Sequence, residues 1–352
     1  MELHALTTVT TDPRARGEAI GTRFAAQVRR VAERYTRHFA VLGIAEPRVR
    51  ELALRSHESL RAWAPELAAE SDACADAAGV ERWRVAAVGA RTEVLAGKDA
   101  RGECSTVVFG AGHGAAPQTM QTWDWHASLV PDGLLHRYTP RPGHTVALFT
   151  EFGAPGKIGV NSAGLGVHFN ILFHRSDSDA GGVPVHAIAR RVLDEAETLD
   201  QAVDLVATAR VSASTALTVV TAAGTASLEL SPAGMAVVPA DADGRLLHTN
   251  HFLDAGLAAG DVAPEDTVTA QRLAHLKTVT PAAPALPAAA RARALCGDAG
   301  ADAVVCLRPD PAKPPHEQWG TLLTIGLDLD ACALDHTTGT LHEASRHGFD
   351  RF

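Results

Sequence analysis

At the stretch Glu103-Cys104-Ser105-Thr106-Val107-Val108-Phe109, the residue pattern of the sequence changes from one typical of helices to one typical of strands. Before it, residues 13 to about 98 carry apolar side chains at helical spacing, with charged residues on the opposite faces, which predicts packed helices. From it onward, β-branched and aromatic residues predict strands at 105–109, 119–125 and 145–150. The cysteine at position 104 is therefore predicted to begin a strand, directly after a polar turn and a long helical region.

The later part of the chain predicts a mixture of strands and helices. A turn at Asn161-Ser162-Ala163-Gly164 favours a hairpin around it, and Pro184 and Thr198 are typical of helix starts. Strands followed by a helical pair and more strands predict layers of α and β structure with mostly antiparallel sheets. The predicted elements are strands at 157–160, 165–170, 216–221, 227–231 and 235–239, helices at 184–197, 198–209 and 267–277, a loop at 281–287, and a closing hairpin of 321–327 and 331–341.

The bulk composition is that of a mildly acidic globular protein. The 352 residues are 46% hydrophobic, which is enough for a substantial core, and the formal net charge is −9. No basic patch with interleaved aromatic residues occurs, so we expect no nucleic-acid partner. No run of eighteen apolar residues occurs and the N-terminus lacks the pattern of a signal peptide, so we expect no membrane partner and a cytoplasmic location.

Five cysteines are scattered along the chain, at positions 74, 104, 296, 306 and 332. Their odd number and the absence of a C-x-x-C pair argue against a disulfide framework and against a cysteine-based zinc site. A reducing compartment is the expected environment. Most free cysteines are small buried hydrophobic residues, so only its context singles out Cys104.

That context suggests an N-terminal nucleophile. A chain break before Cys104 would leave a cysteine at the start of a strand, where its own α-amine, with a pKa of about 7.7–8, can act as the base for its thiol. The alternative is a papain-like Cys-His-Asn site, and the 17 histidines leave that composition open. Papain-like enzymes place the cysteine at the start of a helix, whereas valines and a phenylalanine follow Cys104, which favours the N-terminal nucleophile.

Two further segments offer candidate partners for Cys104. Asp124 lies between Trp123 and Trp125, and strand alternation turns its carboxylate away from both rings. It either faces a turn or solvent, or it holds the freed α-amine. Asn250, in His248-Thr249-Asn250-His251, is either a turn residue or an oxyanion-hole donor, and losing one such donor typically costs about 10²–10³ in rate.

Neither metal nor cofactor chemistry has a motif in this sequence. His248 and His251 are three residues apart, a spacing that suits a helix, but they lie in a strand and turn without an evident third ligand. The glycine-rich run 153–159 lacks the lysine and hydroxyl spacing of a phosphate-binding loop, and no G-x-G-x-x-G opens a helix. We therefore expect no metal and no cofactor.

Taken together, these segments resemble the acyl-CoA:6-aminopenicillanate acyltransferase family, the peptidase C45 group of N-terminal nucleophile hydrolases. The resemblance runs from about residue 101 to the C-terminus, with a weaker helical match before it. Its most specific part is Gly156-Lys157-Ile158-Gly159-Val160-Asn161-Ser162-Ala163-Gly164. The other matching runs are Cys104-Ser105-Thr106, Gln121-Thr122-Trp123-Asp124-Trp125, Thr150-Glu151-Phe152-Gly153 and His248-Thr249-Asn250-His251.

The resemblance implies an α+β protein with the four-layer αββα fold of N-terminal nucleophile hydrolases. It implies self-cleavage between Glu103 and Cys104, giving an N-terminal helical segment, 1–103, and a catalytic segment, 104–352, that form one domain together. By position, Asp124 matches the family's aspartate, Asn250 its oxyanion asparagine, and Arg308, on a poor local match, an arginine near the C-terminal region. The expected pocket residues are Ser105, Thr122, Trp123 and Trp125.

Two positions depart from the family pattern. Glu103 stands where the family usually has glycine, which tolerates the strained backbone that self-cleavage needs, so Glu103 either slows processing or supplies a carboxylate to it. Thr122 stands where the penicillin-forming enzyme has asparagine, which changes the hydrogen bonding of the pocket.

The expected function is hydrolysis of a small-molecule amide through an acyl-enzyme on Cys104, with the two fragments of the chain remaining associated. Acyl transfer from a CoA thioester or an amide to an amine is the alternative, because the two reactions differ only in the acceptor. A catalytically silent binding protein of the same fold is a second alternative, favoured by Glu103 and opposed by the presence of Cys104, Asp124 and Asn250.

Overall fold

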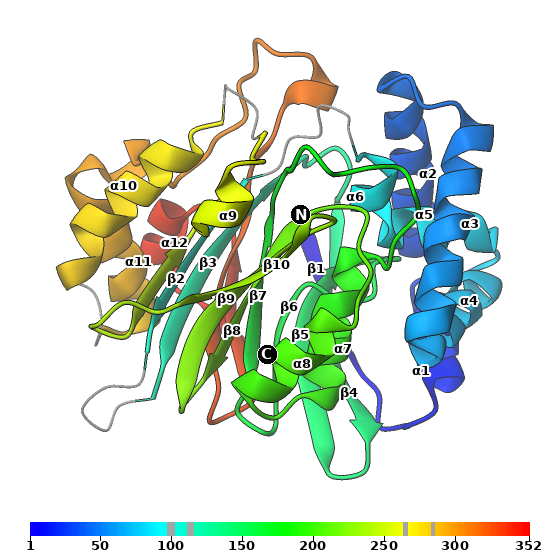
Figure 1. Ribbon diagram of the computed structural model, residues 1–352, viewed down its shortest axis with the longest axis horizontal. Coiled ribbons are helices and arrows are strands. Elements are labelled where there is room, and N and C mark those ends of the chain that lie inside the picture. The colour runs from blue at the N-terminus through cyan, green and yellow to red at the C-terminus, as the bar shows by residue number, and fades with distance from the viewer. Residues whose placement is uncertain (97–102, 111–115, 263–266, 283–285) are drawn as a thin grey trace.

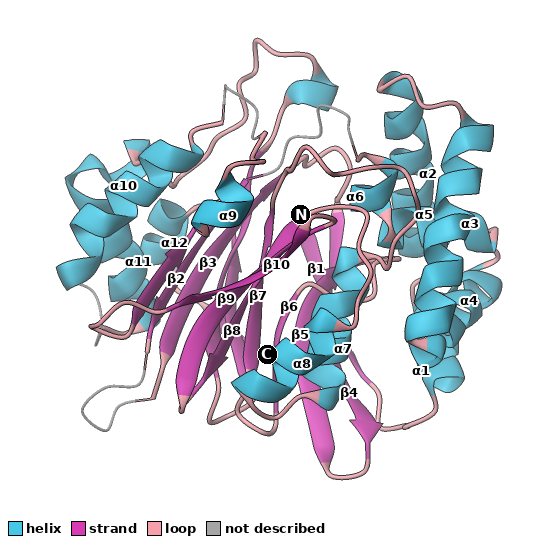
Figure 2. Cartoon of the chain, in the orientation of Figure 1, coloured by secondary structure: helices cyan, strands magenta, loops and turns pink. Residues whose placement is uncertain are grey.

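Two sheets lie face to face in the centre of the protein, and helices cover their outer faces (Figures 1 and 2). The computed structural model describes residues 1–96, 103–110, 116–262, 267–282 and 286–352, and all statements on the fold concern these residues. The resulting order of layers is helix, sheet, sheet, helix. The α+β class and the four-layer αββα arrangement expected from the sequence are confirmed.

The first sheet, called sheet A, contains strands from both sides of Cys104. Its order is β1-β4-β5-β6-β7-β8-β9-β10. β1 pairs with β4 in parallel, and the other neighbouring strands pair antiparallel. The strands are β1 (Glu2–Thr7), β4 (Asp132–Arg141), β5 (His144–Glu151), β6 (Ile158–Asn161), β7 (Gly166–Ile171), β8 (Thr215–Thr221), β9 (Gly224–Ser231) and β10 (Gly234–Pro239).

The second sheet, called sheet B, carries Cys104 in an inner strand. Its order is β11-β2-β3-β12-β13-β14, with antiparallel pairing throughout. Cys104 is the second residue of β2, which lies between β11 and β3. The strands are β2 (Glu103–Phe109), β3 (Gln118–Trp125), β11 (Arg245–His248), β12 (Gly320–Asp328), β13 (Ala333–Thr338) and β14 (Asp350–Arg351).

The segment before Cys104 forms a group of helices at one side of the molecule (blue to cyan in Figure 1). The first helix lies tightly against the fourth because Gly17 and Gly21 face it: a Cβ atom at Gly17 would lie 2.1 Å from the carbonyl oxygen of Glu70. The helices are α1 (Pro13–Arg23), α2 (Ala25–Val41), α3 (Glu46–Trp63), α4 (Pro65–Ala78), α5 (Arg82–Gly89) and α6 (Arg91–Val94).

Two further groups of helices cover the sheets. α7 and α8 contact strands of sheet A, whereas α10, α11 and α12 share a hydrophobic cluster with side chains of β2, β3 and β11. The short helix α9 contacts β10. These helices are α7 (Val185–Glu195), α8 (Leu199–Ala207), α9 (Ala255–Ala258), α10 (Thr269–Val279), α11 (Ala288–Cys296) and α12 (Leu341–His347), with 3₁₀ turns at Thr280–Ala282, Gly297–Asp302 and Pro315–Glu317.

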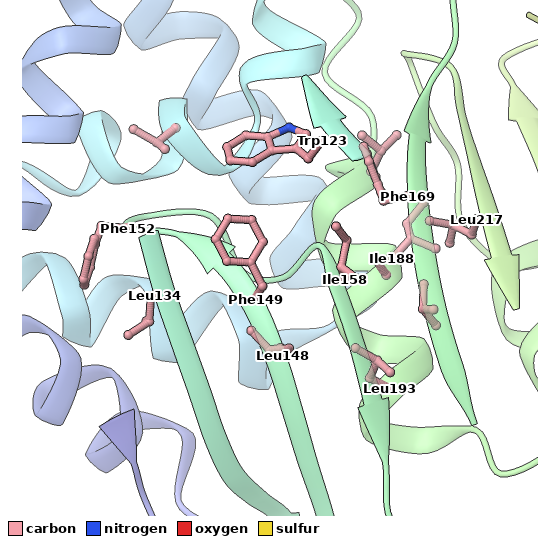
Figure 3. Packing of buried hydrophobic residues seen from close by; sticks show 14 of the residues in the cluster. Trp123, Leu134, Leu148, Phe149, Phe152, Ile158, Phe169, Ile188, Leu193 and Leu217 are labelled. Atoms are coloured by element: carbon pink, nitrogen blue, oxygen red, sulfur yellow. The ribbon is translucent and has the colours of Figure 1, made fainter. Parts of the chain in front are cut away.

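The space between the sheets is filled by large apolar side chains. Figure 3 shows Trp123 of sheet B above Phe149 of sheet A, and their ring centroids are 5.3 Å apart. Cys104 and Trp123 are opposite each other in the β2–β3 pair, so their side chains share one face of the sheet. Because Trp123 faces sheet A, the Cys104 side chain lies in the layer between the two sheets.

A buried charge cluster ties the early helices to the later ones. Glu70 of α4 accepts hydrogen bonds from Nε of Arg16 (2.9 Å) and from Nη2 of Arg190 (3.0 Å), which lies on α7. Nε of Arg190 also binds Asp194 (3.0 Å), whose other carboxylate oxygen accepts from the hydroxyl of Tyr138 (2.5 Å). The cluster therefore links side chains from both sides of position 104.

Most predicted elements are found, and the structure adds several that were not predicted. β1 and β4 were not predicted. Because β1 lies before Cys104, the N-terminal segment contains one strand in addition to its helices. The helices α9, α11 and α12 and the short strand β14 were not predicted either. The final strand ends at Thr338 rather than at Leu341, because Thr340 caps helix α12.

Candidate active site

Hydrogen bonds to its backbone hold Cys104 near the start of β2, an inner strand of sheet B. Its N–H donates a hydrogen bond of 2.7 Å to Oδ1 of Asn250. The residue is 5% exposed, and its carbonyl oxygen accepts from two buried side chains described below. The cysteine and the asparagine predicted from the sequence are therefore brought into direct contact.

Asn250 follows β11 and binds groups of three other segments. Its Oδ1 accepts both from Cys104 N and from Nη2 of Arg272 (2.9 Å), and its Nδ2 donates to the carbonyl of Ile171 (2.9 Å). In this uncut chain the amide NH₂ group is directed at Ile171, and the oxygen faces the nitrogen of Cys104. The side chain thus accepts from the Cys104 nitrogen in this arrangement, and its expected role as an oxyanion donor stays a prediction.

Arg272 was missed in the sequence and lies at the centre of this contact. It projects from α10, is fully buried, and its Nη1 donates to the carbonyl of Cys104 (2.6 Å) and to Oγ of Ser105 (2.9 Å). The sequence offered one signal for it. In the predicted helix 267–277, Arg272 falls four residues before Leu276, on the buried face, where a charged residue requires a partner.

Asn170 was also missed. It comes from the end of β7 in sheet A, and its Nδ2 donates to the carbonyl of Cys104 (3.2 Å), while its Oδ1 accepts from the hydroxyl of Thr106 (2.7 Å). This contact bridges the two sheets. Groups from β7 and α10 therefore meet at the same carbonyl oxygen, from opposite faces of β2.

Asp124 lies on the adjacent strand and is fully buried. Its Cα is paired with that of Glu103 in the β2–β3 register and with that of Thr321 on the other side. Its carboxylate raises the pKa of the Cys104 thiol, and its backbone N–H lowers it. Asp124 is thus next to the Glu103–Cys104 bond, as the sequence suggested.

The four predicted pocket residues do not all line one cavity. Trp125 lines a small cavity together with Arg91, Ile171 and Phe173, whereas Trp123 lies in the core between the sheets. Ser105 accepts from Arg272, and Thr122 is the strand partner of Ser105. Trp125 is therefore the predicted pocket residue that borders a cavity in the described structure.

Arg308 lies outside this cluster. Its side chain is exposed, and it acts electrostatically on Glu343 and Cys306. The structure places a different arginine, Arg272, beside Cys104 and Asn250. The expected role of Arg308 stays a prediction. The packing of α10 brings Arg272 to Cys104 from a segment without a matching motif.

The Cys104 thiol is strongly disfavoured as an anion in the uncut chain. Burial raises its pKa to about 12, and the Asp124 carboxylate adds to this effect. Two cations oppose it, Lys157 and Arg272, both of which lower the pKa of the thiol. The thiol therefore depends on nearby positive charge to ionise.

The two histidines flanking Asn250 bind protein groups. Nε2 of His248 is 2.9 Å from Oε1 of Glu229, and Nδ1 of His251 is 2.8 Å from the hydroxyl of Thr269. Glu229 also accepts from the N–H groups of Leu253 and Asp254. These contacts hold the turn that carries Asn250.

Within the described residues, a group with metal-ligand spacing is found at β1 and β4, not at the site. It consists of Glu2, His4 and Asp132, in which His4 Nε2 is 3.0 Å from Asp132 and Arg30 is 3.4 Å from the same carboxylate. These protein contacts occupy the carboxylate. The described part of the chain also has no helix long and apolar enough to cross a membrane.

Comparisons with known proteins point to one family. Residues 114–329 match the family described as acyl-coenzyme A:6-aminopenicillanic acid acyl-transferase. A curated relative from Emericella nidulans, the 40 kDa form of acyl-coenzyme A:6-aminopenicillanic-acid-acyltransferase, is 32% identical over 196 residues, which is 54% of this chain and 54% of the relative. The chain thus matches about half the length of this relative.

Three solved structures are similar in part. Penicillin V acylase from Agrobacterium tumefaciens is 15% identical with a TM-score of 0.36, covering 67% of this chain and 83% of the other. The Caenorhabditis elegans ortholog of N-acylethanolamine-hydrolyzing acid amidase is 14% identical with a TM-score of 0.42, covering 64% and 93%. A mutant form of conjugated bile acid hydrolase from Clostridium perfringens is 11% identical with a TM-score of 0.41, covering 67% and 89%.

Proposed function

Because the chain belongs to the acyl-coenzyme A:6-aminopenicillanic acid acyl-transferase family, we propose that it is a self-processing hydrolase of small-molecule amides with Cys104 as its nucleophile. In this proposal the bond between Glu103 and Cys104 is cut by the chain itself. The segments 1–103 and 104–352 then remain together as one domain. The α-amine of Cys104 becomes the base for its thiol.

The first stage is an acyl shift within the chain. The Cys104 sulfur attacks the carbonyl carbon of Glu103, the C–N bond breaks, and the Cys104 nitrogen takes up the proton as it becomes an amine. Water then hydrolyses the thioester, releasing the Glu103 carboxylate and the free thiol. Asp124 is adjacent to this bond in the strand register, which suits it to hold the new ammonium group.

The second stage is attack on the substrate. The free α-amine takes the thiol proton, the sulfur forms a thioester with the acyl part of the substrate, and the leaving amine receives the proton. Water completes the cycle. Asn170 Nδ2 lies on the inter-sheet side of Cys104 and supports a role as oxyanion donor, because it already donates to a carbonyl oxygen there.

The observation that carries this proposal is the hydrogen bond of 2.7 Å from Cys104 N to Asn250 Oδ1. The nitrogen that would become the catalytic base is already bound to a buried acceptor, and Arg272 fixes that acceptor with a bond of 2.9 Å.

Acyl transfer remains the second candidate function. It is favoured by the name of the 32% identical relative, an acyltransferase, because the same acyl-enzyme can be resolved by an amine in place of water. A silent binding protein is opposed by the buried contacts of Cys104, Asn250 and Arg272. We also propose a cytoplasmic location, since all five cysteines are free.

Intact-mass spectrometry of the denatured protein tests the proposal. The wild type should give two species that divide between Glu103 and Cys104, and Cys104→Ala should give one full-length species. The cut protein should then hydrolyse members of a panel of N-acyl amides, and adding an amine acceptor separates hydrolysis from transfer. A Cys104→Ala variant that is still cut or active would overturn the scheme, and a wild type that remains intact and shows no unusually reactive cysteine toward iodoacetamide would favour a binding role.

A further inference from the structure

Lys157 belongs to the run that most specifically carries the family resemblance, yet the function described so far gives it no task. It precedes β6 at the inner face of sheet A and is 2% exposed. Its ammonium nitrogen is 2.6 Å from Oε1 of Glu151, the last residue of β5. A lysine this deeply buried requires both a partner and a reason to be there.

The lysine faces the nucleophile across the space between the sheets. Its Nζ lies 3.8 Å from the centroid of the Trp123 ring. Trp123 is the direct strand partner of Cys104, and their side chains share one face of sheet B. Lys157 therefore approaches the Cys104 side chain from sheet A, on the face opposite to that reached by Arg272.

Two groups from the segment before Cys104 complete the cluster. Nη2 of Arg91, on α6, is 2.5 Å from Oε1 of Glu151, and the hydroxyl of Tyr35, on α2, is 2.7 Å from Oε2. Nε1 of Trp125 in turn donates to the Tyr35 hydroxyl (2.8 Å). With two cations and one anion, the cluster carries one net positive charge.

The remaining titratable groups act on this charge to different extents. Glu93, two residues after Arg91 on α6, has its pKa raised to about 7 by burial, so its carboxylate offsets part of the charge above that pH. His186, on α7, is neutral because burial and then Arg91 and Lys157 lower its pKa. The Glu151 carboxylate stays ionised, since Arg91 and Lys157 outweigh its burial and lower its pKa. The Tyr35 hydroxyl stays neutral because burial raises its pKa.

We propose that the cluster of Arg91, Glu151 and Lys157 stabilises the thiolate of Cys104 in the uncut chain, with Lys157 as the positioning residue that brings the positive charge to the Trp123 face. The inference rests on the proposed function of Cys104 and deepens it. Before cleavage the Cys104 nitrogen is an amide and cannot accept a proton. The thiol must then lose its proton to water, because no α-amine is present to accept it. A fixed cation nearby lowers the free-energy cost of forming the thiolate.

The stabilisation of the thiolate by Lys157 is expected only at pH values at which the lysine is charged. Burial lowers the pKa of Lys157 to about 8, against the opposing influence of Glu151. Below that pH the lysine is charged and supports the thiolate, and above it the support fades. Self-cleavage should therefore rise with pH and level off or fall above about pH 8.

The experiment follows the rate of self-cleavage as a function of pH. Wild type and variants are refolded from acidic urea, and the intact masses are recorded over time. Lys157→Met removes the charge, Lys157→Gln removes it but keeps a donor for Glu151, and Lys157→Arg keeps it. Lys313→Met is the matched control. The ammonium nitrogen of Lys313 also lies over a tryptophan, 5.1 Å from the Trp319 ring centroid, but Lys313 is not part of the cluster of Arg91, Glu151 and Lys157.

We expect the neutral variants to cleave about tenfold or more slowly at pH 7 and to need a pH about one unit higher for the wild-type rate. Lys313→Met should keep the wild-type profile. Lys157→Arg should keep the wild-type rate at pH 7, but its rate should continue to rise above pH 8, because its guanidinium stays charged there. The double variant Lys157→Met/Glu151→Gln restores one net positive charge through Arg91, so it should cleave faster than Lys157→Met alone, whereas a merely structural role predicts a further loss.

Unchanged pH profiles in the folded neutral variants would overturn the inference while leaving Cys104 as nucleophile. Failure of both neutral variants to fold, with Lys157→Arg folded, would assign the lysine to stability and also overturn it. A wild type that never cleaves would instead remove the proposed function itself, so the two failures are distinguishable. Circular dichroism at each pH establishes that the compared variants are folded.

Discussion

The backbone nitrogen of Cys104 and the side-chain oxygen of Asn250 are 2.7 Å apart, although 146 positions separate the two residues in sequence. The contact joins the second residue of β2 to the turn after β11. Because β2 and β11 are neighbours in sheet B, Cys104 and Asn250 are held by main-chain pairing on one side and by Arg272 on the other. The acceptor is therefore rigidly positioned in the continuous chain.

Asn250→Ala should reduce amide hydrolysis by the cut enzyme about 10²-fold or more. The substitution removes the acceptor that orients the Cys104 nitrogen, and it leaves that nitrogen and Arg272 short of a partner. Steady-state kinetics on the best amide substrate measures the loss, which should appear in kcat rather than in KM. Rates within a factor of two of wild type would exclude an orienting role for Asn250.

Arg272→Met should prevent self-cleavage and lower stability. Ser105 Oγ loses its donor, which costs about 1–3 kcal/mol, whereas the Cys104 carbonyl keeps Asn170 and Asn250 Oδ1 keeps the Cys104 N–H. Arg291→Met is the matched control. That arginine is also buried under the helical layer, but it donates to the carbonyls of Thr119 and Leu286. Intact mass and urea denaturation should show both variants destabilised and only the first uncut.

Glu93→Gln should flatten the dependence of stability on pH between about 5 and 8. Burial raises the pKa of Glu93 to about 7 from its ordinary 4.5, and the Val185 N–H, at 2.8 Å, opposes this. Between these values the native state holds a proton that the unfolded chain has lost, so stability falls as pH rises, by up to about 3 kcal/mol at pH 7 and above.

The amide in Glu93→Gln cannot ionise and still offers an oxygen to Val185. Urea denaturation of both proteins at pH 5 and pH 8 measures the difference. Equal losses of stability between the two pH values in wild type and variant would show that Glu93 does not titrate as described.

Arg190→Met should destabilise the protein by about 3–5 kcal/mol, because Glu70 and Asp194 would stay buried with less compensation. The control is Arg141→Ala. Its ion pair with Glu197, 2.6 Å long, lies between half-exposed side chains, so solvent screens it and its loss should change stability little. Comparable losses in the two variants, measured by urea denaturation, would contradict the assignment of Arg190 to a buried cluster.

The sequence predicted those elements whose hydrophobic pattern is local. The amphipathic helices before position 95 and the hairpin around Asn161 have clear periodicity and turn residues, and both were found. β1 was missed because it pairs in parallel with β4, a contact between distant segments that leaves no local pattern. α11 is rich in alanine and follows a run of alanines and prolines in the sequence, so its composition did not distinguish it from that run.

The site was predictable to a similar extent. Cys104, Asp124 and Asn250 lie in recognisable runs, and the structure brings Cys104 and Asn250 into contact. Asn170 and Arg272 lie inside segments correctly predicted as strand and helix, but which side chain meets the Cys104 carbonyl depends on how sheet A and α10 dock on β2. That docking is a property of the packed molecule and not of either segment alone.

The buried ions that join α1 and α4 to α7 have a consequence for how the protein comes apart. In the uncut chain, unfolding is a reaction of one molecule, and its midpoint temperature is independent of protein concentration. Once the bond before Cys104 is cut, Glu70 and Arg190 belong to different polypeptides, and separating them becomes a dissociation. The melting temperature of the mature protein then rises with its concentration, so a change in reaction order reports cleavage without any chemical analysis of the chain.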